Sequence, residues 1–218
     1  HKLQQGDPHW LKKNYPIPAE NKILLFVGRL TKEKNLEFLI KAFSQVKVRH
    51  PQTTLVLTAQ GPLEEQLKKL TTSLGMRLEQ DVLFTGALPY ETLANVYHSA
   101  DLFVFSSMTE TQGLVLIEAM AAGLPVVAVK AFGVQDMVDH MVNGILTECD
   151  QGQFYEAICT LLENQGLYHR FQQEALKKAY IMSSENMARK LEKIYQSLLQ
   201  RSVPRKPRRL DFGAWFGS

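Results

Sequence analysis

The sequence predicts an α/β protein built on a doubly wound parallel sheet of about six strands, with extra helices at the carboxyl end. Short apolar runs bounded by Gly, Pro or Asp alternate along the chain with segments of helical periodicity. Most of these runs are apolar at every position, which is typical of strands buried on both faces. Strands of this kind that alternate with helices form a parallel sheet covered on both sides.

Six runs are expected to be strands, at residues 23–27, 54–58, 82–85, 102–105, 126–129 and 144–146. Apolar residues at helical spacing predict intervening helices at residues 36–46, 63–74, 90–98 and 113–122. Gly123 is expected to end the last of these as a C-cap. From Asp150, an expected N-cap, the pattern is helical only, at residues 151–165, 168–178 and 184–200.

The same pattern divides the chain into four parts. Residues 1–18 are polar, contain three prolines and are expected to form an extended interdomain linker. Residues 19–182 are expected to form the sheet domain and residues 183–200 a C-terminal helix. Residues 201–218 contain two prolines and little periodicity, which predicts a basic, flexible tail.

Charge is distributed unevenly over the 218 residues, whose formal net charge is +3. Five of the 25 basic residues but only one of the 22 acids lie at or after Arg201, so the body is close to neutral. This balance argues against nucleic-acid binding by the body. The uncharged apolar stretch from Ala119 to Val129 is far shorter than the roughly 18 residues that a membrane helix requires.

Targeting and cysteine patterns favour the cytoplasm. We find no signal-peptide pattern at the start, and the chain begins at His1, so we expect a piece of a longer protein. Its two cysteines form neither a metal motif nor a disulfide framework, which favours a reducing compartment.

Candidate binding residues follow the first predicted strand. Parallel sheets bind ligands at the carboxyl ends of their strands. There, Gly28 permits close backbone approach, and Arg29 and Lys34 can clamp a phosphate. The alternative is a solvated loop whose basic residues contact nothing.

A second candidate group follows the fourth strand. If a helix begins near Gln112, the backbone N–H groups of Gly113, Leu114 and Val115 form an anion site. Glu118 lies one turn deeper and Glu110 lies in the preceding loop, and both carboxylates can accept hydrogen bonds from sugar hydroxyls. The alternative is that Glu110 caps the helix and Glu118 faces solvent.

Other chemistries find less support. The loops after the second and third strands offer backbone groups for a flat base, or they are plain turns. The six histidines lack metal-ligand spacing, so we expect no metal site. A phosphate-binding P-loop, a dinucleotide fingerprint and a nucleophile elbow are all missing from the sequence, which argues against an ATPase, an NAD enzyme and a serine hydrolase.

These motifs together resemble a known family. They are Gly28-Arg-Leu with Glu33-Lys-Asn, the pair Glu110 and Glu118 separated by seven residues, and Glu118-Ala-Met-Ala-Ala-Gly-Leu-Pro-Val-Val. This combination resembles the C-terminal domain of the group 1 retaining glycosyltransferases of GT-B fold, over about residues 20–200. The resemblance implies a Rossmann-like domain that binds a nucleotide-sugar donor.

The resemblance also implies roles for particular residues. Arg29 and Lys34 look like the ligands of the donor diphosphate, and Glu110 looks like the ligand of the donor sugar hydroxyls. Glu118 looks like the ribose ligand, and the segment around Leu88 is where such enzymes contact the base. The remaining expected contacts with sugar and phosphate come from Gly28, Gln112, Gly113, Leu114 and Val115. Because cationic side chains and a helix N-terminus stabilise the leaving group in this family, no metal cofactor is expected.

Some details depart from the family pattern. Gln112 stands where Phe is frequent, Ala59 where Gly is frequent, and Asp136 where Glu is frequent. The Thr109-Glu-Thr-Gln-Gly-Leu variant is similar to bacterial diacylglycerol glucosyltransferases, which favours UDP-glucose as donor and a lipid acceptor. GDP-mannose or another sugar donor with a saccharide acceptor, and a non-catalytic nucleotide-binding domain, are the alternatives.

Two further expectations concern partners. Members of the family have an N-terminal Rossmann-like domain with the acceptor site and a catalytic histidine, and nothing in residues 1–18 can replace it. We therefore expect this chain to bind a nucleotide sugar without transferring it. The tail combines basic residues with Phe212, Trp215 and Phe216, which suits peripheral contact with an anionic membrane. The alternatives are a disordered end and nucleic-acid binding through the tail.

Overall fold

The computed structural model describes residues 5–201 and confirms the predicted fold class. Six parallel strands form one sheet in the order β3-β2-β1-β4-β5-β6. This is the order of a doubly wound sheet of the Rossmann type. The strands are β1 Lys22–Arg29, β2 Thr53–Gln60, β3 Val82–Phe84, β4 Leu102–Phe105, β5 Val126–Val129 and β6 Gly144–Thr147.

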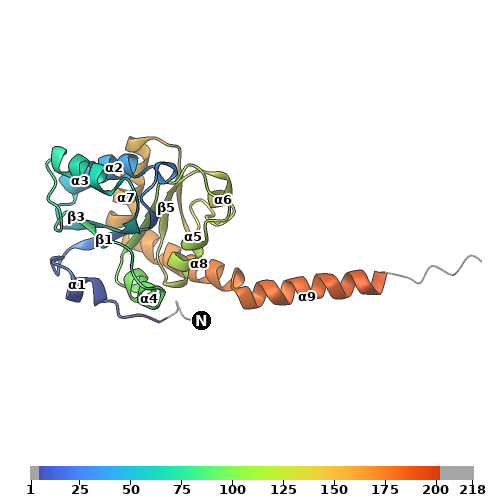
Figure 1. Ribbon diagram of the computed structural model, residues 1–218. Helices are drawn as coiled ribbons and strands as arrows, with labels where there is room; N and C mark the ends of the chain where they lie inside the picture. Colours follow the sequence, from blue (N-terminus) through green and yellow to red (C-terminus); the bar gives the residue numbers. More distant parts are fainter. Residues whose placement is uncertain (1–4, 202–218) are drawn as a thin grey trace, which may run out of the picture. The chain divides into compact units, whose positions relative to one another are not determined.

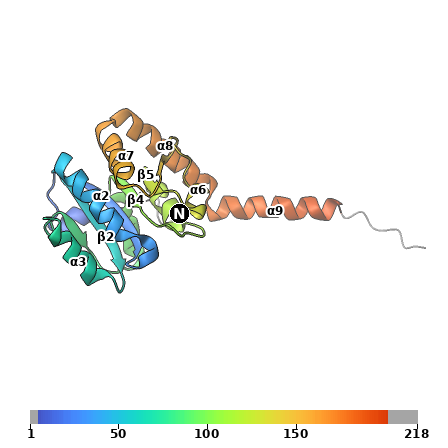
Figure 2. The same ribbon diagram turned by 90° about the horizontal axis from the view of Figure 1, so that it is seen from above.

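Helices cover both faces of the sheet. On one side α2 packs against α3 and α7, and on the other α5 packs against α8 and α1 against α4. Figure 1 shows α2, α3 and α7 on one side of the sheet, and Figure 2 shows α2 between α3 and α7. The helices are α1 Trp10–Asn14, the 3-10 helix η1 Lys32–Lys34, α2 Leu36–Arg49, α3 Glu64–Ser73, α4 Tyr90–His98, α5 Leu114–Ala121, α6 Phe132–Gln135, α7 Gln151–Glu163, α8 Gln165–Ile181 and α9 Ser184–Arg201.

The strands form the core because nearly all of their residues are buried. Every residue of β3, β4, β5 and β6 is buried, as are all residues of β2 except the last. This burial on both faces explains why the strands read as apolar runs rather than as alternating patterns. A stack of Phe26, Phe103 and Phe105, with ring centroids about 6 Å apart, joins β1 to β4.

The N-terminal segment corrects one expectation. Residues 1–18 were expected to be extended, but Trp10–Asn14 form helix α1. Leu11 is fully buried and Ile17 nearly so, because α1 packs against α4 and the Leu11 N–H donates to Ser99 Oγ. The helix is too short for its periodicity to be visible, and one buried side chain, that of Leu11, anchors it to the core. Whether the segment also serves as an interdomain linker stays a prediction.

Two other helices differ from the predictions. The four-residue helix α6 was not expected, since four residues carry no period. Helix α8 begins at Gln165 rather than Tyr168, because Asn164 caps it by accepting a hydrogen bond from the Leu167 N–H. Asp150 caps α7 as predicted, through the Gln153 N–H.

A buried carboxylate joins the amino ends of the strands. The Asp81 side chain is 6% exposed and lies just before β3. It is paired with Lys47 of α2 at 3.0 Å and with Arg77 at 2.9 Å, and it also accepts from the Arg77 backbone N–H. Lys47 donates in addition to the carbonyls of Pro51 and Thr53. The cluster therefore connects α2 to the strands on the side of the sheet away from the expected site.

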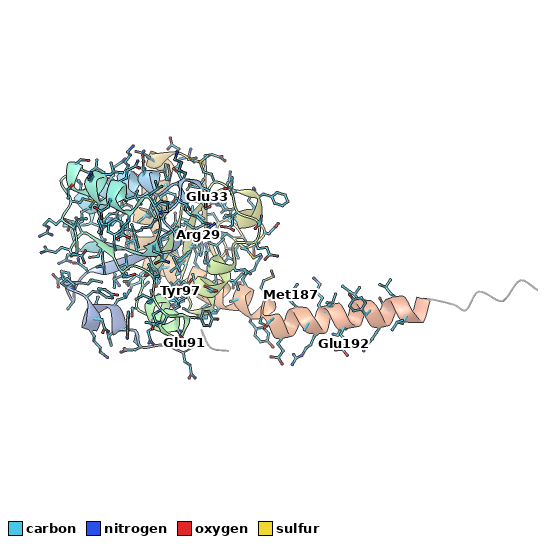
Figure 3. The ribbon with its side chains drawn as sticks, viewed as in Figure 1. Arg29, Glu33, Glu91, Tyr97, Met187 and Glu192 are labelled. Atoms are coloured by element: carbon cyan, nitrogen blue, oxygen red, sulfur yellow. The ribbon has the colours of Figure 1, made fainter. Side chains whose placement is uncertain are left out.

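The chain divides into two compact units, the first ending at Met182 and the second beginning at Ser183. In the second unit, α9 carries exposed apolar residues at intervals of four, three and four positions, namely Met187, Leu191, Ile194 and Leu198. Figure 3 labels Met187 and Glu192 on this helix. Among residues 5–201, no helix combines the length and the apolar character needed to cross a membrane. Residues 202–218 of the expected basic tail lie outside the described residues, so its membrane contact stays a prediction.

Candidate functional site

The loops singled out from the sequence meet where the strand order reverses, between β1 and β4. Open parallel sheets bind ligands at such a point, because the helices that follow the two strands lie on opposite faces and leave a crevice. β1 pairs with β4 only at Leu24–Leu102 and Leu25–Phe103, whereas it pairs with β2 as far as Arg29. The two strands therefore separate toward their carboxyl ends.

Hydrogen bonds hold the two loops together beyond this point. Ser106 Oγ donates to the Lys34 carbonyl at 2.7 Å, and Ser107 Oγ donates to the Glu33 carbonyl at 3.2 Å. The Met108 N–H also donates to the Glu33 carbonyl, at 3.2 Å. Since both serine side chains are completely buried, these bonds satisfy polar groups that would otherwise be costly. The loop after β4 thereby sets the position of the loop after β1.

Lys34 and Glu110, 76 positions apart, form an ion pair across the crevice. Lys34 Nζ lies 2.8 Å from Glu110 Oε2, and the two side chains are only 15% and 17% exposed. Lys34 Nζ also lies over the Phe105 ring, 5.5 Å from its centroid, in a cation–π contact. Both residues were predicted as site residues, and the structure brings them together.

The pKa of Glu110 reflects this setting. Burial raises the pKa of its carboxyl, but the Lys34 ammonium and the backbone N–H groups of Gly113 and Thr111 lower it by more. The net pKa lies below the ordinary value, so Glu110 is ionised at neutral pH and available as a hydrogen-bond acceptor. Glu110 can therefore accept a hydrogen bond from a neutral hydroxyl group of a ligand, while Lys34 beside it can bind an anionic group of the same ligand.

The N-terminus of α5 points to the same crevice, as the sequence predicts. Gly113 has φ +58° and precedes the helix, where a Cβ would lie 2.9 Å from Leu116 Cδ1. The left-handed conformation and the close contact explain the glycine. A cavity of about 240 Å³ lies here, lined by Val27, Gly28, Lys34, Glu110, Thr111, Gln112, Gly113, Leu114 and Val115. All of the predicted site residues apart from Arg29, Leu88 and Glu118 therefore line one cavity.

A second cavity of about 490 Å³ continues from the first. It shares Lys34, Glu110 and Thr111 with it and is further lined by Arg29, Glu33, Met108, Thr109 and Phe132. The Arg29 side chain is 75% exposed and forms an ion pair of 3.5 Å with the Glu33 carboxylate. Figure 3 shows Arg29 and Glu33 close together. Since exposed ion pairs contribute little, Arg29 is available to an anionic ligand.

Leu88 and Glu118 do not line these two cavities. Leu88 is half-buried in the loop between β3 and α4 and packs against the core. Glu118 lies on α5, one turn beyond Leu114, and accepts a hydrogen bond of 2.7 Å from the Tyr97 hydroxyl. The alternative in which Glu118 simply faces solvent does not fit this contact, and a role for Glu118 in ligand binding stays a prediction.

Sequence reasoning missed the apolar residues of the larger cavity. Phe132 is 85% exposed and Met108 is more than half exposed, and both line the cavity beside the Lys34–Glu110 pair. Neither Met108 nor Phe132 is among the residues that the sequence predicts to contact a ligand. An aromatic residue three positions after the end of β5 was the available signal.

Gly133 holds α6 against the Glu110 loop. Its N–H donates to the Glu110 carbonyl at 3.0 Å. A Cβ at this position would lie 2.6 Å from the Glu110 carbonyl oxygen and 2.6 Å from the Thr111 carbonyl carbon. Both contacts are with backbone atoms, so a side chain fits only if the loop moves.

Gly133→Ala is expected to lower the free energy of unfolding by about 1–3 kcal/mol, the usual cost of overpacking. Urea denaturation measures this. Gly166→Ala is the matched control, because the nearest atom to a Cβ there lies 3.6 Å away and the residue is helical. It is expected to be neutral or stabilising. Equal stability of Gly133→Ala and the natural chain would contradict the close approach.

The family model for the group 1 glycosyl transferases matches residues 10–178. The chain belongs to this family. The matched range contains both cavities and all of the predicted site residues, so the expectation of family and fold is confirmed.

Curated relatives agree with this family. An uncharacterised glycosyltransferase of Methanocaldococcus jannaschii is 39% identical over 134 residues, which cover 62% of this chain and 34% of that protein. A D-inositol 3-phosphate glycosyltransferase of Corynebacterium efficiens is 31% identical over 212 residues, which cover 94% of this chain and 50% of that protein. The chain thus spans half or less of the length of these relatives.

Solved structures show the same fold. Sucrose-phosphate synthase of Thermosynechococcus elongatus superposes with a TM-score of 0.78 at 27% identity, covering 92% of this chain and 51% of that one. HepE of Anabaena, solved in complex with UDP-glucose, superposes with a TM-score of 0.74 at 28% identity, covering 89% of this chain and 52% of that one. The finer resemblance to diacylglycerol glucosyltransferases stays a prediction.

Proposed function

We propose that this chain is the donor-binding half of a retaining glycosyltransferase that takes a hexose from a nucleotide sugar, with UDP-glucose favoured. The observation that carries the proposal is the meeting of Lys34, Glu110 and the N-terminus of α5 in one crevice at the switch point of the sheet. The HepE complex with UDP-glucose supports the choice of donor. Retention of the anomeric configuration rests on the family resemblance of the motifs.

The charges in the crevice match the parts of such a donor. In the proposal, Lys34, Arg29 and the backbone N–H groups at the start of α5 bind the diphosphate, since cations and a helix N-terminus both attract anions. Glu110 accepts hydrogen bonds from the sugar hydroxyls and Glu118 from the ribose hydroxyls. Leu88 lies near the base.

Catalysis in this proposal depends on stabilising the leaving group. The bond from the anomeric carbon to the phosphate oxygen breaks, and the acceptor hydroxyl oxygen bonds to that carbon while its proton passes to the departing diphosphate. The negative charge that develops on the diphosphate is stabilised by Lys34 and Arg29. The α5 dipole adds partial positive charge at the same place. We propose that these groups serve without a metal cofactor. Among residues 5–201, no cluster of three acidic, His or Cys side chains is placed to hold a metal ion.

Calorimetry of the purified chain tests donor binding. We expect UDP and UDP-glucose to bind, and UDP-glucose to bind more tightly than GDP-mannose. Glu118→Ala is expected to weaken both uridine ligands about tenfold or more, since a hydrogen bond to a charged group contributes roughly 1.5–3 kcal/mol. Glu110→Gln is expected to weaken UDP-glucose but to leave UDP nearly unchanged. If no nucleotide sugar binds, the proposal is wrong.

The acceptor side is proposed from the resemblance alone. We propose that a second Rossmann-like domain supplies the acceptor site and the catalytic histidine, and that the acceptor is a diacylglycerol. The chain by itself is then expected to bind UDP-glucose without transferring glucose to diacylglycerol in detergent micelles. Glucosyl transfer by these 218 residues alone would refute the requirement for a second domain. Donor binding without transfer in any longer form would favour a non-catalytic nucleotide-binding protein.

A further inference from the structure

The hydroxyl of Tyr97 is buried against the residue proposed to bind ribose. Tyr97 lies near the end of α4, and its side chain is fully buried. Its ring packs against Phe103 of β4 with centroids 6.0 Å apart. A buried hydroxyl requires a hydrogen-bond partner, and Tyr97 donates to Glu118 Oε2 at 2.7 Å. Figure 3 labels Tyr97 together with Glu91, another residue of α4.

In the hydrogen bond between Tyr97 and Glu118, Tyr97 is the donor and the carboxylate is the acceptor. Burial, and secondly the Glu118 charge, raise the pKa of Tyr97 well above its ordinary value. The phenol therefore stays protonated throughout the neutral range, and its proton points to the carboxylate. A carboxylate has about four acceptor positions. The bond to Tyr97 uses one of them and leaves the carboxylate able to accept from ligand hydroxyls.

Without this bond, Glu118 is a flexible side chain on a half-buried helix face. Such a side chain loses rotamer freedom when it binds a ligand, and this loss reduces affinity. Tyr97 lies on a different helix from Glu118, and its ring is held by the core. It can therefore hold the carboxylate in one orientation before the ligand arrives.

We propose that Tyr97 is a positioning residue, which holds the Glu118 carboxylate in the orientation that accepts the ribose hydroxyls of the nucleotide-sugar donor. The inference rests on the proposed function, in which Glu118 is the ribose ligand. Tyr97 does not touch the donor in this proposal, and its effect reaches the ribose only through Glu118.

The test compares UDP with 2′,3′-dideoxy-UDP, which lacks the ribose hydroxyls, by calorimetry on the full chain. The natural chain is expected to prefer UDP about 10- to 100-fold, the range expected for hydrogen bonds to a charged group. Tyr97→Phe keeps the ring that packs against Phe103 and removes only the hydroxyl. The preference is expected to fall about fivefold or more, whereas affinity for pyrophosphate stays unchanged.

Tyr168→Phe is the matched control. The Tyr168 hydroxyl is partly buried and donates to the Asp101 carbonyl at 3.0 Å rather than to Glu118. Removal of the Tyr168 hydroxyl is expected to change the free energy of unfolding about as much as removal of the Tyr97 hydroxyl, but to leave the preference for UDP intact. Incorporation of 4-aminophenylalanine at position 97 restores a donor and is expected to restore the preference. If Tyr97→Phe does not fold, the 4-aminophenylalanine variant decides the question. A folded variant that prefers UDP over 2′,3′-dideoxy-UDP supports the inference, and a folded variant that does not prefer UDP overturns it.

The outcomes separate this inference from the proposed function. If the natural chain binds no UDP, the proposed function is wrong. If it prefers UDP and Glu118→Ala abolishes the preference while Tyr97→Phe retains it, only the role of Tyr97 is wrong. Equal loss of UDP and pyrophosphate affinity in Tyr97→Phe would show a general structural role and would also overturn the inference.

Discussion

Lys34→Ala is expected to weaken binding of UDP-glucose about 10- to 100-fold, because a hydrogen bond between a cation and a phosphate contributes roughly 1.5–3 kcal/mol. Lys34 lines both cavities and is the best-positioned cation of the crevice, only 15% exposed. Its loss also leaves Glu110 without its ion-pair partner, so the Glu110 carboxylate then repels the diphosphate with an uncompensated charge. Isothermal calorimetry at a fixed salt concentration measures the change.

Lys32→Ala is the matched control for this prediction. Lys32 belongs to the same 3-10 helix but is exposed and lines neither cavity. The two variants lose the same net charge, so any effect of overall charge is common to both. Lys32→Ala is expected to change the affinity less than twofold, since exposed charges are screened by salt. Equal losses in the two variants would refute a specific phosphate contact of Lys34.

Asp81→Asn is expected to lower the free energy of unfolding by about 3 kcal/mol or more, as is usual when one partner of a buried ion pair is removed. Asp81 is paired with Lys47 and Arg77, and Lys47 is itself only 16% exposed. The variant leaves the Lys47 ammonium without its carboxylate in a buried place. Urea denaturation at pH 7 measures the loss.

The same carboxylate predicts how stability depends on pH. Burial raises the pKa of Asp81, but Arg77 and Lys47 lower it by more, so its folded-state pKa lies well below the unfolded value of about 3.9. A depressed pKa stabilises the fold above the unfolded pKa, and this stabilisation is lost as the pH falls. Between about pH 5 and pH 2 the natural chain should lose stability with a slope of up to about 1.4 kcal/mol per pH unit from this group.

Asp139→Asn provides the control for the Asp81 prediction. Asp139 forms an ion pair of 3.0 Å with Lys178, but its side chain is half exposed. Its removal is expected to cost less than about 1 kcal/mol, as for other surface ion pairs. The stability difference between Asp81→Asn and the natural chain should shrink toward acid pH. A difference that stays constant from pH 7 to pH 3 would contradict the depressed pKa.

Most of the site was predictable because its parts lie next to strand ends. Gly28, Lys34 and Glu110 follow apolar runs, and all parallel strands end at the same edge of the sheet. Gly113 precedes a helix whose periodicity is plain. Such signals are local, since each depends on fewer than about ten neighbouring residues.

The contacts that could not be predicted join distant positions. Tyr97 and Glu118 belong to different helices. Asp81 lies just before β3, whereas its partner Lys47 lies on α2. Each of these residues reads locally as an ordinary member of a helix or turn. The short helices α1 and α6 are not predicted for a related reason. They have only five and four residues, which is too few to show helical periodicity, and tertiary contacts of Leu11 and Gly133 hold them in place.

The pattern of apolar runs and helical segments is enough to predict the class of the fold and the place of the candidate site. Continuous apolar runs require burial on both faces, and this burial requires a parallel sheet with helices on both sides. Which loops meet depends on the order of the strands in the sheet, and this order is seen in the folded chain alone. The strand order places β1 beside β4, so Lys34 and Glu110 pair across 76 positions, and it brings Tyr97 to Glu118. Local periodicity reports which residues are buried but not which strands are neighbours.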